Sequence, residues 1–257
     1  MPTLKATARQ TLKSMLQGTW VHHAVWAYKN PPAEDRSANY DRQTVQVMFR
    51  ALRRSSNCID VGAHTGDILR YMTEIAPRGR HHAFEPLPHL ANGLGQRFPQ
   101  VLVHEAALSD KKGESEFLFV ENDPAYSGLQ RRVYYRPDPQ ITKIRVRVAT
   151  LDETIPADER TDLIKIDIEG GEYHALKGGI ETIRRGRAIV VFEGGSHSTG
   201  QYGVSPDDVY RLVTHTLEYE LSTMERWLKR KPPYTREEFE KNWYDGPDYY
   251  FIAAPSR

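Results

Sequence analysis

The sequence predicts a doubly wound α/β fold, in which helices cover both faces of a mostly parallel sheet. Three observations carry this prediction. The apolar run Cys58–Val61 ends in a glycine loop, Gly62–Gly66, that can turn a strand into a helix beside a nucleotide-like cofactor. About twenty residues later a second apolar run ends at Glu85, a spacing at which an acid binds ribose hydroxyls. Further apolar runs alternate with helical patterns along the chain. The plainer alternative is an ordinary strand-to-helix turn followed by a solvated Glu85.

The length and composition predict one sizeable domain with a full hydrophobic core. The chain has 257 residues, and its 35 Lys and Arg nearly balance its 34 Asp and Glu. A net charge of +1 predicts neither nucleic acid nor a membrane as the principal partner. The single cysteine, Cys58, excludes an intrachain disulfide and suits a reducing compartment. Because no apolar stretch approaches the roughly 18 residues of a membrane span and no signal peptide is visible, we expect a soluble cytoplasmic protein.

The N-terminal part predicts helices. Residues 4–28 mix apolar with basic and small residues, which indicates one or two helices that end before Pro31 and Pro32. We treat 1–39 as an N-terminal helical extension and 40–257 as the main domain. An amphipathic helix is expected from Tyr40 to Leu52, directly before the first strand.

The remaining elements follow from periodicity and from helix start and stop signals. Pro77 ends the helix that follows the glycine loop, and Ser205-Pro206-Asp207-Asp208 is a typical helix start. Segments 114–120 and 144–148 alternate with period two around a long Gly- and Pro-bearing stretch, which predicts a hairpin-like excursion outside the parallel core. We expect helices at 66–76, 87–98 and 173–184, and strands at 80–84, 101–106, 163–168, 188–192, 219–224 and 249–253.

Charged residues interrupt the predicted strand at 163–168. Ile164, Ile166 and Ile168 alternate with Lys165, Asp167 and Glu169, so one face of a buried strand carries charges near its carboxyl end. Doubly wound sheets bind ligands at that end. Either Lys165 neutralises the carboxylates structurally, or the group belongs to a working site. Glu169 can also serve as a cap for the next helix.

The strand at 188–192 ends in a similar way, with an acid and a histidine. Glu193 follows it directly and His197 lies four residues further on, so both are candidates for accepting a proton. His197 has a plain alternative as a surface residue. Tyr126-Ser127-Gly128 either lines an acceptor pocket or forms a simple turn. Acids in this number also suit Mg²⁺, but their spacing matches no metal signature, so we name no metal ligand and leave metal assistance as an open alternative.

An ordered set of motifs resembles the FkbM-type family of S-adenosylmethionine-dependent methyltransferases. The resemblance covers roughly residues 40–200, and its most specific segment is Lys165-Ile166-Asp167-Ile168-Glu169-Gly170, followed by Glu172. The other segments are Ile59–Gly66, Phe84-Glu85-Pro86, Ala106–Asp110 with Gly113, Thr150-Leu151-Asp152, and Leu176-Lys177-Gly178.

The resemblance implies a Rossmann-like class I methyltransferase fold, with a seven-stranded sheet whose last strand is antiparallel. It also implies the positions that hold S-adenosylmethionine. Asp60 and the loop with Gly62, Ala63, His64 and Gly66 would surround the methionine part, Glu85 with Pro86 the ribose, and Ala107 with Leu108 the adenine. Asp167 is predicted both to contact the cofactor and to take part in catalysis.

The sequence thus predicts an O-methyltransferase acting on a hydroxyl of a small molecule, such as a sugar, a glycan precursor or a secondary metabolite. Asp167 is the first candidate for taking the hydroxyl proton, with Glu193 and His197 behind it, and Lys165 would hold Asp167 in its charged form. Two alternatives stay open: a nicotinamide-dependent oxidoreductase and a non-catalytic metabolite-binding module. Several aromatics either stack on the acceptor or belong to the core: Trp20, Trp26, Trp227, Tyr234, Trp243 and Tyr244.

Overall fold

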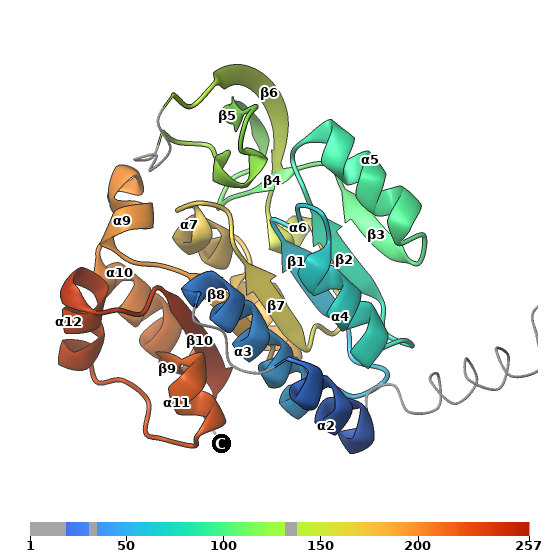
Figure 1. Ribbon diagram of the computed structural model, residues 1–257. Helices are drawn as coiled ribbons and strands as arrows, with labels where there is room; N and C mark the ends of the chain where they lie inside the picture. The colour runs from blue at the N-terminus through green and yellow to red at the C-terminus, as the bar shows by residue number, and fades with distance from the viewer. Residues whose placement is uncertain (1–18, 31–34, 132–137, 257) are drawn as a thin grey trace, which may run out of the picture.

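The computed structural model describes residues 19–30, 35–131 and 138–256. Its centre is a seven-stranded sheet in the order β3-β2-β1-β7-β8-β10-β9 (Figure 1). The last strand of the chain, β10, runs antiparallel to both of its neighbours, whereas the pairs from β3 to β8 are parallel. This confirms the predicted α/β sheet. The strands are β1 Cys58–Val61, β2 His81–Phe84, β3 Val101–His104, β7 Leu163–Ile166, β8 Ile189–Glu193, β9 Tyr219–Thr223 and β10 Tyr250–Pro255.

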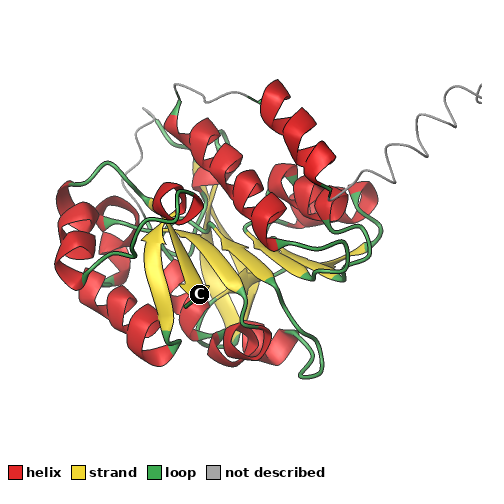
Figure 2. Ribbon diagram, turned by 90° about the horizontal axis from the view of Figure 1, so that it is seen from below, coloured by secondary structure: helices red, strands yellow, loops and turns green. Residues whose placement is uncertain are grey.

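Helices cover both faces of this sheet, as Figure 2 shows from below. Successive strand residues point to opposite faces, so each strand contributes to two hydrophobic clusters. On one face Cys58 and Leu163 pack with α2 Trp20–Lys29, α3 Arg36–Ala51, α4 Asp67–Ile75, α5 Pro88–Arg97 and α11 Met224–Leu228. On the other face Ile59 and Ile164 pack with α6 Leu151–Thr154, α7 Glu172–Lys177, α8 Ile180–Gly186, α10 Pro206–Arg211, a π-helical turn at Leu212–Thr216, and α12 Arg236–Asp245.

A second, three-stranded sheet stands beyond the carboxyl ends of the large one (Figure 1). It has the order β4-β6-β5, with β4 Ala107–Leu108, β5 Gly113–Val120 and β6 Ile141–Ala149. β5 and β6 pair antiparallel along their length, which confirms the predicted excursion outside the parallel core. A 3₁₀ turn, η1 Pro124–Tyr126, follows β5. The segments α9 Ser196–Thr199 and η2 Gly200–Tyr202 follow β8.

Several predicted boundaries were wrong. The strand expected at 163–168 ends at Ile166, so Asp167 and Glu169 lie in the loop that follows it, and Glu193 is the last residue of β8 instead of the residue after the strand. The strand expected at 101–106 ends at His104, because the chain turns there and enters the second sheet as β4. The helix expected at 173–184 is two helices, separated at Gly178, where a side chain would lie 2.1 Å from the Ser109 carbonyl oxygen. The helix expected from Tyr40 begins at Arg36, because Asp35 caps it by accepting from the Ala38 amide.

The N-terminal extension packs against the main domain. Trp26 on α2 is 8% exposed and belongs to the same cluster as Val45 and Met48 on α3. It is therefore a core residue. Trp243 is also buried and stacks on Phe251. Residues 1–18 and the side chain of Trp20 lie outside the described part of the chain.

Candidate active site

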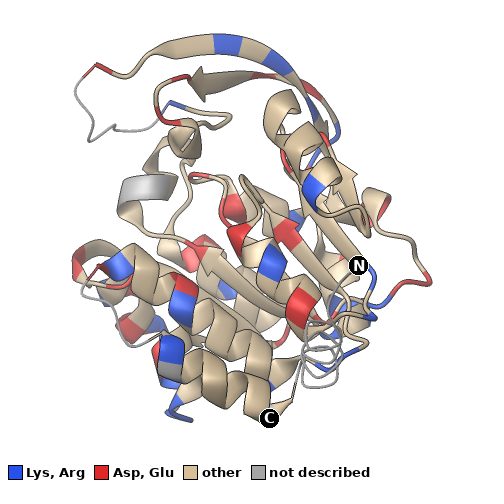
Figure 3. Cartoon of the chain, turned by 45° about the vertical axis from the view of Figure 1, so that its right-hand side comes forward, with Lys and Arg blue, Asp and Glu red and all other residues tan. Residues whose placement is uncertain are grey.

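Lys165 connects two carboxylates at the carboxyl edge of the sheet. β1 and β7 pair so that Asp60 and Lys165 are direct neighbours, and both side chains point to the face that α3 and α4 cover. The Lys165 Nζ lies 3.5 Å from Asp60 Oδ1 and 3.4 Å from Asp167 Oδ2, and it donates to the Gly62 carbonyl at 3.1 Å. Figure 3 shows acidic positions gathered near this edge, below the three-stranded sheet.

The glycine loop after β1 lies against the end of β7. Gly62 has φ +73°, and a Cβ there would lie 1.9 Å from the Asp167 carbonyl oxygen. Only glycine fits this close approach. Gly66 is also left-handed, at φ +82°, but it packs against Phe98 and Leu94 and is not among the residues that line the cleft. Gly66 thus forms the turn into α4, and its contact with the cofactor stays a prediction.

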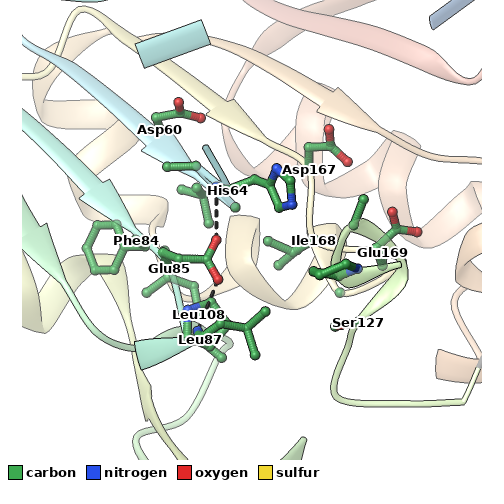
Figure 4. Close-up of a pocket in the computed structure, with 18 of the residues that line it drawn as sticks. Asp60, His64, Phe84, Glu85, Leu87, Leu108, Ser127, Asp167, Ile168 and Glu169 are labelled. Atoms are coloured by element: carbon green, nitrogen blue, oxygen red, sulfur yellow. Dashed lines mark hydrogen bonds between the residues drawn. The ribbon is translucent and has the colours of Figure 1, made fainter. Parts of the chain in front are cut away.

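Glu85 joins the glycine loop to the chain that follows β2. Its carboxylate accepts hydrogen bonds from the His64 amide at 2.9 Å and from the Leu87 amide at 3.0 Å, shown as dashed lines in Figure 4. Burial raises the pKa of Glu85, although these amides oppose the shift. A carboxylate has about four acceptor positions, so two remain for ligand hydroxyls.

These residues form one wall of a cleft, here called the cofactor cleft. The predicted cofactor residues line it, with the exception of Gly66: Asp60, Gly62, Ala63, His64, Glu85, Pro86, Ala107, Leu108 and Asp167. The excursion supplies the facing wall through Phe117, Pro124, Ala125, Ser127 and Leu129. The role of the excursion is thus to cover the cleft.

A constrained loop follows β7 and shapes the floor of the site. Glu169 adopts φ +62° and Gly170 φ +106°. Glu172 holds this loop, because its buried Oε1 accepts from the amides of Ile168 and Gly170 at 2.9 and 3.1 Å. Burial raises the pKa of Glu172 to about 7, against the effect of these amides. The Glu172 of the predicted motif is therefore an anchor for the loop that carries Asp167.

A second cavity, here called the outer cavity, adjoins the cofactor cleft. The two share Ala125, Asp167 and Glu169. Glu193, the acid predicted after β8, also lines the outer cavity, together with Tyr126, Trp243, Tyr244, Asp248, Tyr249 and Tyr250. Asp167 thus lies where the two cavities meet.

Opposite charge and hydrogen bonds hold Asp167 ionised. Burial raises the pKa of Asp167, but the Lys165 ammonium and donated hydrogen bonds outweigh it and bring the pKa below its ordinary value. The strongest bond comes from Tyr250, whose hydroxyl donates to Asp167 Oδ2 at 2.5 Å. Oxygen atoms of Asp167, Glu169 and Glu193 lie within 4.8 Å of one another. Carboxylates this close together can hold a divalent cation, so the absence of a metal stays a prediction.

The sequence reasoning missed several residues of the site, among them Tyr250, Asp41 and Asp248, which lines the outer cavity. Tyr250 comes from β10, and its Cα pairs with that of Glu193 in the antiparallel register. Asp41 comes from α3 and lines the cofactor cleft. The adjacent tyrosines Tyr249 and Tyr250, at the start of the last strand, were the sequence feature that could have indicated a role for Tyr250. The backbone of His197 lies in α9, but its side chain lies outside the described part of the chain.

The sheet order, the glycine loop after β1 and the acid after β2 define a class I methyltransferase fold. Within the described residues, every helix is too short or too polar to cross a bilayer. The family model of the methyltransferase FkbM domain matches residues 60–230, which is more than half of the chain. The chain belongs to the FkbM methyltransferase family, and its cofactor is S-adenosylmethionine.

Individual known proteins resemble the chain at low sequence identity or over only part of its length. Methyltransferase FkbM from Methylobacillus flagellatus KT is 17% identical, with a TM-score of 0.49 over 79% of this chain and 44% of its own. An O-methyltransferase from Bacillus cereus in complex with SAH is 9% identical, with a TM-score of 0.44 over 92% of this chain and 89% of its own. The curated AMB antimetabolite synthetase AmbE from Pseudomonas aeruginosa is 31% identical over 157 residues, 47% of this chain. The chain spans only 7% of that protein.

Proposed function

We propose that the protein is an O-methyltransferase that acts on a hydroxyl of a small molecule, such as a sugar, a glycan precursor or a secondary metabolite. One observation carries the proposal. Asp167 lies in the wall that the cofactor cleft and the outer cavity share, so one carboxylate faces both the place of the methyl donor and the place of an acceptor.

The residues of the cofactor cleft fit S-adenosylmethionine. The side chain of Asp60 is 1% exposed, and among the described residues neither of its oxygens accepts a close hydrogen bond; its ion-pair partner Lys165 lies 3.5 Å away and is shared with Asp167. These oxygens can receive the ammonium group of the cofactor. Gly62 keeps the loop free of a side chain, and Glu85 retains positions for the ribose hydroxyls. When bound, the cofactor supplies a methyl group on a sulfonium, whose transfer to the acceptor oxygen leaves a neutral thioether and releases the hydroxyl proton.

Asp167 is the proposed proton acceptor. A carboxylate with a lowered pKa is too weak a base to ionise a free alcohol. It suffices here, because the hydroxyl becomes strongly acidic once its oxygen bonds to the methyl carbon. Lys165 keeps Asp167 ready for this proton by holding it in the charged form. Glu193 and His197 remain the second candidates for the same role.

The outer cavity is the proposed acceptor site. Its carboxylates, from Asp167, Glu169, Glu193 and Asp248, accept hydrogen bonds and therefore suit an acceptor rich in hydroxyl groups. Trp243 and Tyr244 offer ring faces on which a flat or cyclic acceptor can pack. Residues that hold the cofactor and residues that hold the acceptor thus meet at Asp167.

Family membership overturns the oxidoreductase alternative, because the family transfers methyl groups. A non-catalytic binding module would not need the polar strand ends, and this chain keeps Lys165, Asp167 and Glu193. A cytoplasmic location, and partners that include neither nucleic acid nor membrane, stay predictions. The buried, single Cys58 supports a reducing compartment.

The test combines cofactor binding with a methyl-transfer assay. Calorimetry should show binding of S-adenosylhomocysteine and none of NADH; the reverse would overturn the proposal. Radiolabelled S-adenosylmethionine is then offered with a panel of sugars and hydroxylated metabolites. We expect Asp167→Asn to keep cofactor affinity and to lose about 10²- to 10⁴-fold in rate, the usual contribution of a general base. Asp158→Asn, at an exposed position, is the matched control. An Asp167→Asn protein with the wild-type rate would refute the role of Asp167.

A further inference from the structure

Tyr250 reaches the candidate site from the opposite end of the chain. Its hydroxyl donates to Asp167 Oδ2 at 2.5 Å, and the Lys165 Nζ contacts the same oxygen at 3.4 Å. Both contacts are to Oδ2, and Glu193 is a further hydrogen-bond partner of the same carboxylate. A carboxylate held at one oxygen has a fixed side-chain rotation, and this determines which oxygen can meet an acceptor hydroxyl.

The phenol of Tyr250 is itself held in place. Its ring stacks on Tyr40, with centroids 5.0 Å apart and an interplanar angle of 26°. The Tyr40 hydroxyl donates to Asp248 at 3.1 Å, which ties α3 to the start of β10. Across the sheet, Tyr250 pairs with Glu193 of β8. Burial and the negative charges nearby keep the pKa of Tyr250 far above its ordinary value, so the phenol stays a donor.

We propose that Tyr250 is a positioning residue for methyl transfer, which orients Asp167 through its hydroxyl and stabilises the charge on it. The inference rests on the proposed function, since it assigns Asp167 to the acceptor. Tyr250 is not proposed as a proton acceptor. Its loss would leave Asp167 present but less fixed in rotation and easier to protonate, because a hydrogen bond to the charged form favours that form.

Several groups besides Tyr250 act on the titration of Asp167. They come from five helices and strands and from the loops after β1 and β7, and they are Asp41, Asp60, His64, Lys165, Glu169, Glu172 and Glu193. A substitution at Tyr250 leaves all of them in place. The shift that it causes in the titration of Asp167 therefore reports on the loss of the Tyr250 hydroxyl, including the part that acts through Glu193, which interacts with both residues.

The test compares two neighbouring tyrosines. Tyr250→Phe removes the hydroxyl and keeps the ring that packs on Tyr40. Tyr249→Phe is the matched control, because its hydroxyl contacts Ser37 at 3.2 Å rather than Asp167. The titration of Asp167 is followed through its ¹³C-labelled carboxyl carbon by NMR, with Asp167→Asn to assign the signal. The acid limb of kcat/KM against pH is measured on the same proteins.

We expect the Asp167 midpoint and the acid limb to move upward by about one pH unit in Tyr250→Phe, because a hydrogen bond to a charged group is worth about that much. Both should stay in place in Tyr249→Phe. A merely structural role would lower activity without moving either. An unmoved Asp167 midpoint in folded Tyr250→Phe would overturn the inference. The NMR shift needs no turnover, so a moved midpoint without methyl transfer to any acceptor would count against the proposed function alone.

Discussion

We expect the charged side chain of Asp60, which is proposed to bind the cofactor, to lower the stability of the folded protein at neutral pH. Its side chain is 1% exposed, and burial, offset in part by Lys165, raises its pKa from 3.8 to about 6. Each unit of this shift corresponds to about 1.4 kcal/mol, so the charged form is about 3 kcal/mol less favourable in the folded protein than in the unfolded one. We therefore expect Asp60→Asn to stabilise the protein.

The size of the gain follows from what the substitution keeps. Asn has nearly the same volume as Asp, and Lys165 retains Asp167 as a partner. Burying the new amide without full hydrogen bonding costs about 1 kcal/mol or more, which leaves a net gain of about 1 to 2 kcal/mol. For a protein of this size, that raises Tm by about 2 to 8 °C. The same change removes the charge that would receive the cofactor's ammonium group, so affinity for S-adenosylhomocysteine should fall at least about tenfold.

The pH dependence distinguishes this explanation from a packing effect. Above pH 6 the folded wild type carries the full penalty, because Asp60 is charged. As the pH falls toward 3.8, both the folded and the unfolded state bind the proton and the penalty disappears. The advantage of Asp60→Asn should thus be largest at pH 7 to 8 and shrink by pH 5.

Thermal denaturation of both proteins across this pH range, without ligand, is the assay. Asp67→Asn is the control, because Asp67 lines the same cleft but its side chain is 77% exposed, and its stability should change by less than about 0.5 kcal/mol. A loss of stability in Asp60→Asn at pH 7, or a difference that does not depend on pH, would refute the reasoning.

Two further predictions concern the glycine loop after β1 and the change in stability at acidic pH. Gly62→Ala should lower cofactor affinity more than tenfold and destabilise the fold by about 2 kcal/mol or more, because the new Cβ would lie 1.9 Å from the Asp167 carbonyl and φ is +73°. Gly93→Ala, in open space on α5, is its control and should be neutral or slightly stabilising in the same denaturation and calorimetry experiments. Burial and the neighbouring His82 lower the pKa of His104 from 6.5 to about 4, so the unfolded chain binds this proton first. After allowance for the partial exposure of the ring, this group alone should lower stability by about 1 kcal/mol between pH 7 and pH 5, against the opposite contributions of Asp60 and Glu172, whose pKa values are raised. The stability of His104→Gln relative to the wild type should therefore rise by about 1 kcal/mol over this range in urea titrations, and an unchanged difference would show that His104 makes no such contribution.

Local patterns predicted the cofactor side of the site. The glycine loop, Glu85 and the charged end of β7 each stand within a few residues of a strand end, and the carboxyl ends of parallel strands meet at one edge. The resemblance to the FkbM family assigned both Asp60 and Asp167 to the cofactor, and the pairing of β1 with β7 brings the ends of their strands together. The excursion was also recognised, because its strands alternate with period two. Its position over the cleft follows from tertiary packing, which no local pattern carries.

The acceptor side depends on contacts that the sequence does not encode locally. Tyr250 lies 83 residues from Asp167, and the two meet only because β10 enters the sheet antiparallel between β8 and β9. A shift of one residue in that register would turn Tyr250 to the opposite face. The break in the helix at Gly178 has a similar origin, since the residue that excludes a side chain there is Ser109.

Lys165 makes the two halves of the site electrostatically dependent on each other. Its ammonium lies almost equally far from Asp60 and Asp167, at 3.5 and 3.4 Å, so one positive charge serves two carboxylates. A cofactor ammonium beside Asp60 would offset the negative charge of that carboxylate and so weaken its repulsion on Asp167, while Lys165 keeps its contact with both acids. The carboxylate proposed to take the proton would therefore be best held in its charged form when the methyl donor is present. Substitution of either acid must change the titration of the other.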